Sequence, residues 1–479
     1  MNYRMLGYLL GLILSTEAAL LLAPSATALC YNESPLPFLI TAAVLLAVAV
    51  PLVLQKPRNT RIYAREGFVC VALGWLLLSA FGALPFVISG AIPHYVDAFF
   101  ETVSGFTTTG ASILSAVEGL PYGILFWRSF THWIGGMGVL VFVLAVLPSS
   151  GGSSIHLMRA EVPGPTKGKL VPRMRQTALI LYGIYVALTA VQTVCLCLTG
   201  MPFFDALVNA FATAGTGGFA MKNASIAGYA NPAAEWVIAI FMFLFGINFN
   251  MYFFLLIRRF RDIWKSEELR VYFLLCGAAV TVVALNTAHL FTSAGDCIRT
   301  AFFQASSLMS TTGFSTVDYS LWPALSKAVL VLLMITGSCA GSTAGGLKLS
   351  RCIILAKNVL GEFRRMLHPR AVNVTRLDGE PVSDDTCRVA SNYLALYLLL
   401  ILFAFLLVSI SGFGLESDLT AVLACINNIG PGLGEVGPAG NFGGYSALSK
   451  TVLSFTMLFG RLEIMPMLIL FSPSTWRKR

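Results

Sequence analysis

Four short tracts of glycine and hydroxyl residues recur along this chain, each at the end of an apolar stretch. They read Thr108-Thr109-Gly110-Ala111, Thr216-Gly217-Gly218-Phe219, Thr311-Thr312-Gly313-Phe314 and Asn428-Ile429-Gly430-Pro431. Their central glycines follow one another at intervals of 108, 95 and 117 residues. Glycine permits backbone angles that a side chain forbids, so each tract can turn its carbonyl oxygens toward a common axis. A ring of such oxygens replaces the hydration shell of a monovalent cation.

A second set of residues accompanies the tracts. Thirteen positions before each central glycine stand Asp97, Asp205, Thr300 and Ser417. All four are residue types that accept hydrogen bonds from the free amides at the start of a helix. We therefore expect a half-helix of about three turns before each tract, capped by these residues. The partial negative charge at its carboxyl end favours a cation beside the tract.

The composition is that of a membrane protein. Of 479 residues, 56% are hydrophobic and only 11% are charged, and the mean hydropathy is +0.77. Runs close to the roughly 20 residues that cross a bilayer predict ten spans. These are 4–22, 35–54, 68–91, 122–147, 177–199, 234–257, 271–292, 325–357 (interrupted), 389–411 and 447–471. Four shorter apolar pieces are predicted to be re-entrant half-helices, at 96–108, 204–214, 299–310 and 418–428.

These elements predict an all-α integral membrane fold. Two leader helices precede four repeats of helix, pore loop and helix, which surround one pore in a pseudo-fourfold arrangement. Each repeat alone buries little, and the four together enclose an axis. The expected units are 1–66 for the leader and 67–176, 177–269, 270–387 and 388–479 for the repeats.

The net charge of +9 is concentrated in alternate connections. Segments 55–66, 149–176, 258–270, 348–388 and 472–479 hold 25 of the 32 lysines and arginines. Cytoplasmic loops of membrane proteins carry such an excess. We therefore expect both termini in the cytoplasm, and we do not interpret the positive charge as a nucleic-acid-binding surface.

The tracts resemble those of the Trk/Ktr/HKT superfamily of potassium transporters, most closely its bacterial Trk membrane subunits. The matching stretches are Gly-Phe-Thr-Thr-Thr-Gly-Ala at 105–111, Thr-Gly-Gly-Phe at 216–219, Ser-Thr-Thr-Gly-Phe at 310–314 and Asn-Asn-Ile-Gly-Pro-Gly-Leu-Gly at 427–434. The resemblance implies potassium uptake by a homodimer, with K⁺ as the transported ion and no covalent cofactor. It implies a K⁺ filter made of Thr108, Thr109, Gly110, Thr216, Gly217, Gly218, Thr311, Thr312, Gly313, Asn428, Ile429 and Gly430.

Two positions in these tracts bear on the selectivity that the resemblance implies. Sodium-preferring members of the superfamily have serine at the first filter position, so Gly110 favours potassium. Gly217 stands where a threonine-like residue is usual, and the relative weight of Gly217 and Gly218 stays open.

The eighth predicted span is interrupted by a glycine-rich stretch from Thr336 to Lys348. Irregular backbone at membrane depth persists only where protein covers it or where it lines water. The resemblance implies an intramembrane gate here, formed by Gly337, Gly341, Gly345, Gly346 and Lys348. It also places Arg461, a charge within the last span, beside this gate, where a functional role is the default. The alternatives are a permanently kinked helix and an arginine that pairs with a structural carboxylate.

Other polar residues give weaker signals. Arg128 and His132 lie four apart on one face of the fourth predicted span and are expected near the outer interface. Glu17 is expected to contact a helix next to the first span. Five outer acidic residues are expected to cap helices or to concentrate cations; they are Asp97, Glu101, Asp205, Asp296 and Asp418.

The sequence is compatible with three functions. The first is a gated, channel-like potassium uptake subunit, or a poorly selective K⁺/Na⁺ channel, in the inner membrane of a bacterium. It would be surrounded by membrane lipid, and a separate cytoplasmic nucleotide-binding subunit would regulate it through the basic loops. The second is a proton- or sodium-coupled symporter, which needs a titratable group along the path, and the tracts contain none. The third is a membrane enzyme, but the five histidines are scattered.

Overall fold

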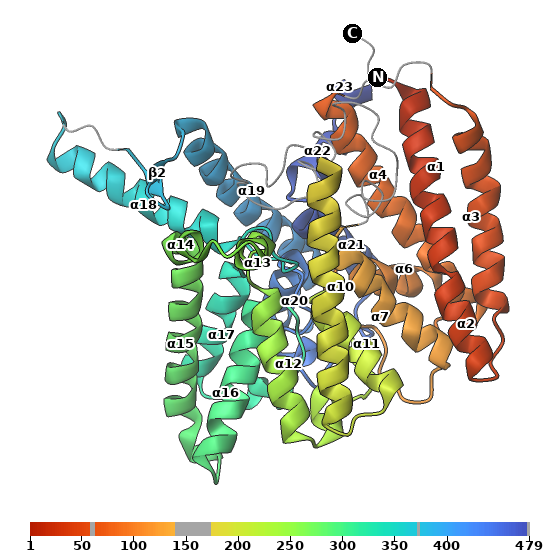
Figure 1. Cartoon of the computed structure of the whole chain (residues 1–479), viewed down its shortest axis with the longest axis horizontal. Coiled ribbons are helices and arrows are strands. Elements are labelled where there is room, and N and C mark those ends of the chain that lie inside the picture. Colours follow the sequence, from red (N-terminus) through yellow and green to blue (C-terminus); the bar gives the residue numbers. More distant parts are fainter. Residues whose placement is uncertain (58–62, 139–173, 371–373, 477–479) are drawn as a thin grey trace.

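The computed structural model describes residues 1–57, 63–138, 174–370 and 374–476. The leader consists of α1 (Tyr3–Leu20), α2 (Leu22–Cys30) and α3 (Leu36–Leu54). Helix α1 packs along α3 (Figure 1). Their backbones approach closely at Gly11, where an added β-carbon would lie 2.8 Å from Cβ of Leu52. Small residues at such a crossing let helices pack tightly in a membrane.

Four repeats follow the leader. Repeat 1 contains α4 (Ala64–Gly82), α5 (Leu84–Ile88), α6 (Tyr95–Phe106) and α7 (Tyr122–Gly136). Repeat 2 contains α10 (Met174–Leu198), α11 (Phe203–Ala214), η2 (Ser225–Tyr229), α12 (Pro232–Phe245), α13 (Phe249–Leu256) and α14 (Phe260–Lys265). Repeat 3 contains α15 (Glu267–Thr287), η3 (Ala288–Leu290), α16 (Ala294–Met309), η4 (Tyr319–Leu321), α17 (Ala324–Thr336) and α18 (Leu349–Leu367). Repeat 4 contains α19 (Asp384–Val408), η5 (Ser409–Ser411), α20 (Leu415–Ile426), η6 (Gly434–Val436), α21 (Ala447–Arg461), α22 (Met465–Phe471) and α23 (Pro473–Trp476).

The half-helices and the helices that follow them form a closed ring of eight. In chain order, α6 contacts α7, α7 contacts α11, and α11 contacts α12. The same alternation continues through α16, α17, α20 and α21, and α21 returns to contact α6. The predicted pseudo-fourfold arrangement is confirmed. Between repeats 3 and 4 the described chain also holds a small hairpin of β1 (Arg376–Leu377) and β2 (Glu380–Pro381), which the all-helical prediction did not include.

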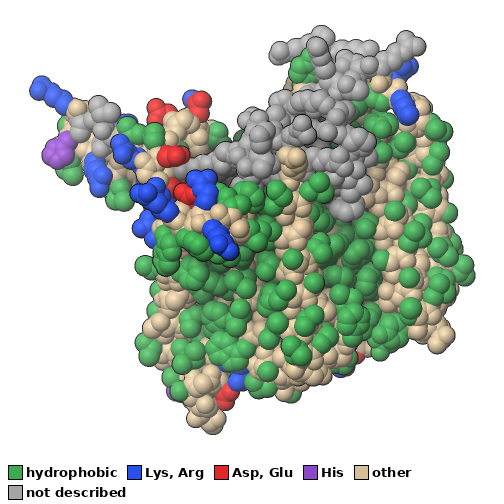
Figure 2. Space-filling model, viewed as in Figure 1, with side chains coloured by type: hydrophobic (Ala, Val, Ile, Leu, Met, Phe, Trp, Pro, Cys, Tyr) green, Lys and Arg blue, Asp and Glu red, His purple; other side chains and the backbone are tan. Residues whose placement is uncertain are grey.

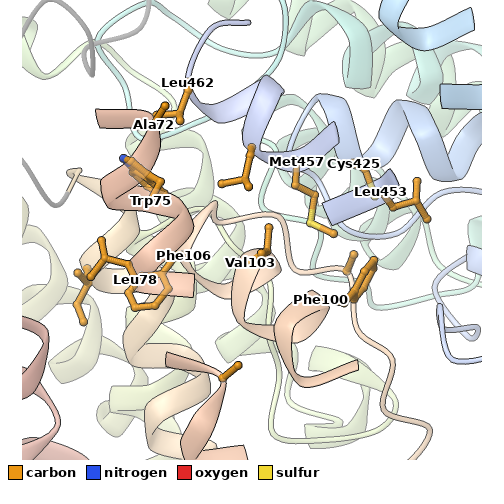
Figure 3. Packing of buried hydrophobic residues seen from close by; sticks show 14 of the residues in the cluster. Ala72, Trp75, Leu78, Phe100, Val103, Phe106, Cys425, Leu453, Met457 and Leu462 are labelled. Atoms are coloured by element: carbon orange, nitrogen blue, oxygen red, sulfur yellow. The ribbon is translucent and has the colours of Figure 1, made fainter. Parts of the chain in front are cut away.

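A buried apolar cluster joins the first repeat to the last. Val103 and Phe106 of α6 lie between Trp75 of α4 and Met457 of α21, and all four side chains are at most 1% exposed (Figure 3). These side chains fill the space between α4, α6 and α21 densely. The cluster therefore fixes the position of the first half-helix.

The spans differ in part from the prediction. Six helices in the described residues are long and apolar enough to cross a membrane, or seven if α12 and α13 are counted together. That pair is bent by 91° at residues 246–248, where a straight span was predicted. The last predicted span is also broken, at 462–464, whereas the interruption predicted in the eighth span is confirmed at 337–348. Residues 139–147 of the fourth predicted span lie outside the described residues.

The predicted helix caps were wrong. The residues that precede the four half-helices are His94, Pro202, Ser293 and Gly414. Asp97, Asp205 and Ser417 are instead third in their helices, and Thr300 lies further inside α16, because that helix begins earlier than predicted. The negative charges of Asp97 and Asp205 still stabilise the positive amino-terminal ends of their helices. Their side chains are bound by Lys450 at 2.7 Å and by Tyr229 at 2.9 Å, respectively.

Charge and apolar surface are segregated on the molecule. Figure 2 shows hydrophobic side chains over the flanks of the helices and lysines and arginines gathered around α14 and α18. The start of α1 and the short helix α23 lie on the same side of the molecule (Figure 1). The distribution agrees with a multi-pass membrane protein.

Candidate functional site

The four tracts have the same backbone conformation. Each half-helix is followed by a residue with φ between 54° and 57°, which is Thr108, Thr216, Thr311 or Asn428. The central glycines also have positive φ, from 79° to 99°. Such angles cost a β-branched residue about 1–3 kcal/mol and persist where the surrounding structure enforces them, typically at functional sites.

One hydrogen bond repeats in every tract. The backbone N–H of Thr109 donates to the carbonyl oxygen of Ser104, five residues earlier, at 2.8 Å. The equivalent bonds are Gly217 to Ala212 at 2.8 Å, Thr312 to Ser307 at 2.8 Å and Ile429 to Ala424 at 2.9 Å. A bond of this span is typical of a helix that ends in a left-handed residue. Each half-helix therefore ends in the same way and passes its chain into the tract at the same angle.

The tracts touch one another in chain order and close a ring. A β-carbon on Gly110 would overlap the carbonyl oxygen of Gly217. The same overlap would occur between Gly218 and Thr312, and between Gly313 and Ile429. On Gly430 it would lie 2.8 Å from the carbonyl oxygen of Thr109, which returns the ring to the first tract. We call residues 108–110, 216–218, 311–313 and 428–430 the tract ring. All twelve predicted filter residues are in it.

One side of the tract ring opens into a cavity of about 140 Å³. Its lining includes all four central glycines and is otherwise formed largely by small and polar residues, among them Ser112, Asn223, Ser315 and Asn441. A hydrated ion is the kind of occupant that such a lining accepts.

A buried ion pair lies behind the ring. Glu101 of α6 and Arg128 of α7 are joined at 2.7 Å, with side-chain exposures of 0% and 4%. Arg128 also donates to the carbonyl oxygen of Ala220 at 3.1 Å and covers the ring of Phe219 at 3.6 Å. The expectation that Arg128 anchors at the outer interface and that Glu101 concentrates cations there is wrong, because the pair braces tract 1 against tract 2.

His132 completes this brace. Its Nε2 accepts from the backbone N–H of Phe219 at 3.3 Å, so its Nδ1 carries the proton and donates to the carbonyl oxygen of Gly105 at 2.7 Å. It is fully buried rather than near the outer interface. The sequence predicted an interfacial position instead, although a charge and an imidazole four residues apart within an apolar helix could have indicated a buried role.

The other side of the tract ring is occupied by segment 337–348. The N–H of Gly345 donates to Oγ1 of Thr311 at 2.7 Å, and Ser338 Oγ donates to the carbonyl oxygen of Met309 at 2.8 Å. A β-carbon on Gly345 would overlap the carbonyl oxygen of Asn427. The predicted gate residues Gly337, Gly341, Gly345, Gly346 and Lys348 all belong to this segment, and it is buried almost throughout.

Two cations hold the segment. Arg461 donates to the carbonyl oxygens of Thr343 at 2.8 Å and Gly136 at 2.9 Å, and to that of Gly135. The ammonium group of Lys348, itself 1% exposed, donates to the carbonyl oxygen of Ala344. Arg461 and the segment therefore meet, as the family resemblance implied, whereas Glu463 pairs with Arg351 of α18.

The family model TrkH, described as a cation transport protein, matches residues 37–478. The chain belongs to the TrkH family. This confirms the resemblance to Trk proteins that the tracts indicated. The family is one of transporters and not of enzymes. The chain is 36% identical to the Trk system potassium uptake protein TrkH of Salmonella typhimurium, over 100% of both chains. It is 34% identical to the Trk system potassium uptake protein TrkG of Escherichia coli, over 99% of both.

A solved structure of this family has the same fold. The crystal structure of the potassium transporter TrkH from Vibrio parahaemolyticus matches with a TM-score of 0.89 over 100% of both chains, at 34% identity. The chain therefore has the TrkH fold.

Proposed function

We propose that this chain takes up potassium through the tract ring. The proposal rests on the contacts between the tracts. Each central glycine lies against a backbone carbonyl of the next tract, and these contacts bring the four loops around one axis. Carbonyl oxygens at such an axis coordinate a dehydrated monovalent cation. The relatives named above are potassium uptake proteins, and Gly110 leaves the first tract without a side chain in the ring.

The ion enters from the cavity outside the ring and meets segment 337–348 on the other side. This segment is the gate. Its contacts with Thr311 and with Arg461 support a closed gate. They hold an uncharged loop and the positive charge of Arg461 across the path of the ion. A cation approaching Arg461 is repelled until the segment and the arginine move.

The proposal extends to the assembly. The chain works as a homodimer in the inner membrane of a bacterium, with both termini in the cytoplasm and lipid around the apolar flanks. The leader 1–66 and the four repeats are its structural units. A cytoplasmic nucleotide-binding subunit regulates the gate, and it docks on the basic surface around α14 and α18.

Growth and flux measurements test this function. A bacterium that lacks potassium uptake should grow at low potassium when it expresses the chain with its regulatory subunit. In liposomes, potassium flux should follow the membrane potential, whereas flux that tracks a proton or sodium gradient at fixed potential would favour a symporter. Equal potassium and sodium fluxes would favour a poorly selective channel. Shortening 337–346 should leave flux without the regulator, and loss of flux in a folded protein would make the segment structural.

A further inference from the structure

Glu268 stands in the first turn of α15 and points into segment 337–348. Its carboxylate oxygen Oε1 accepts the backbone N–H of Ala340 at 2.7 Å and the backbone N–H of Ser350 at 3.0 Å. The residue is 8% exposed. Backbone amides that are bonded to a carboxylate form stronger hydrogen bonds than those between neutral groups.

The first amide belongs to the gate segment and the second to the first turn of α18, so they enclose residues 341–349. Between them are Thr343, which binds Arg461, and Gly345, which binds Thr311. One carboxylate oxygen therefore fixes both ends of this stretch to a single point on α15. The stretch itself contains positive φ angles at Gly341, Gly346 and Lys348, so regular helical bonds do not hold it.

We propose that Glu268 is a positioning residue that holds segment 337–348 closed. The inference rests on the proposed function, since it assigns the residue that sets the closed position of that gate. Without the carboxylate, two buried amides lose their partner, which disfavours this conformation of the segment.

The first turn of α15 is also fastened to the cytoplasmic side. Glu267 pairs with Lys357 of α18, and its N–H donates to the carboxylate of Asp378 in the β1–β2 turn at 2.8 Å. A displacement of α18 or of this turn therefore moves the neighbouring residue, Glu268, and with it the segment at Ala340 and the start of α18 at Ser350. This contact gives a regulatory subunit bound at α18 a short route to the segment.

The test compares Glu268→Ala, Glu268→Gln and wild type, reconstituted in liposomes without a regulatory subunit. Glu235→Ala and Glu235→Gln are matched controls, because Glu235 is also 8% exposed and binds Arg299 at 2.7 Å at the other end of the molecule. Potassium flux is one readout. The second is labelling of Cys339, a 1% exposed residue of the segment, by a water-soluble thiol reagent, followed by mass spectrometry of its peptide.

We expect Glu268→Ala to raise both regulator-independent flux and Cys339 labelling by about tenfold or more, the effect of losing hydrogen bonds to a charged group. Glu268→Gln keeps an acceptor oxygen and should show a smaller rise, whereas a purely structural role would lower flux in both variants. The Glu235 variants should match wild type in Cys339 labelling.

Wild-type flux and labelling in folded Glu268→Ala and Glu268→Gln would overturn the positioning role. If neither wild type nor Glu268→Ala carries potassium, even with the regulatory subunit added, but Cys339 labelling still rises in Glu268→Ala, the proposed function fails and the positioning role stands.

Discussion

The side-chain amide of Asn428 lies 3.0 Å from Oγ1 of Thr109, although 319 residues separate them in the chain. The same nitrogen donates to the carbonyl oxygen of Met457 at 3.0 Å. An amide nitrogen carries two donors, whereas a hydroxyl carries one. The asparagine that departs from the threonine of the other tracts therefore joins the last repeat to the first and closes the tract ring.

Replacing Asn428 with alanine should loosen this closure. It removes two buried hydrogen bonds, for which we expect a loss of about 1–3 kcal/mol in the free energy of unfolding. The potassium over sodium flux ratio in liposomes should fall as well, because the carbonyls of tracts 1 and 4 lose their spacing. Asn286→Ala is the control, since Asn286 donates to Ser326 at 2.8 Å, away from the ring. Its thermal stability should drop without a change in ion ratio, and an unchanged ratio in Asn428→Ala would contradict the role of the amide.

Gly110→Ser should lower the preference for potassium. The new β-carbon overlaps the carbonyl oxygen of Gly217, so this oxygen must turn away or shift. We expect the potassium over sodium ratio to fall by about tenfold, which corresponds to about 1.4 kcal/mol of discrimination. Gly119→Ser is a matched control, because Gly119 has a φ of 96° with open space around its Cα. If both variants keep the wild-type ratio, Gly110 does not set selectivity.

Arg461→Ala should open the gate. The guanidinium group binds carbonyl oxygens of segment 337–348 and of α7, and each hydrogen bond from a charged donor contributes about 1.5–3 kcal/mol. Regulator-independent potassium flux should rise by about tenfold or more. Arg461→Lys retains the charge but not the fork of donors, so its flux should lie between those of Arg461→Ala and wild type. Wild-type flux in Arg461→Ala would show that the arginine does not restrain the gate.

The ion pair of Glu101 and Arg128 should show strong coupling. Removing one partner of a buried pair leaves an uncompensated charge, for which we expect a loss of about 3–5 kcal/mol. Glu101→Gln and Arg128→Met should each lower thermal stability sharply. The double variant should lose less stability than the sum of the losses in the two single variants. The exposed pair of Asp385 and Arg388 should give coupling of about 1 kcal/mol or less in the same cycle. Additive losses at Glu101 and Arg128 would mean that the pair does not act as a unit.

The half-helices show where sequence patterns lose precision. The spacing of Asp97 and Asp205 predicted helix starts within a few residues, but neither is a cap, because packing against Lys450 and Tyr229 sets their position. The breaks between α12 and α13 and between α21 and α22 were not predicted, since mean hydropathy over a long window stays high there and does not record a bend.

The sequence by itself determined that this protein crosses a membrane, that it has four repeats, and that glycine must stand at the centre of each tract. These properties are local: hydropathy, periodicity and the angles that a residue type permits are written in short stretches of chain. Only the tertiary structure decided which distant groups meet, as Asn428 does with Thr109, His132 with Phe219 and Glu268 with Ala340 of the gate segment. Such contacts depend on how helices pack around one axis, and packing depends on the whole chain at once.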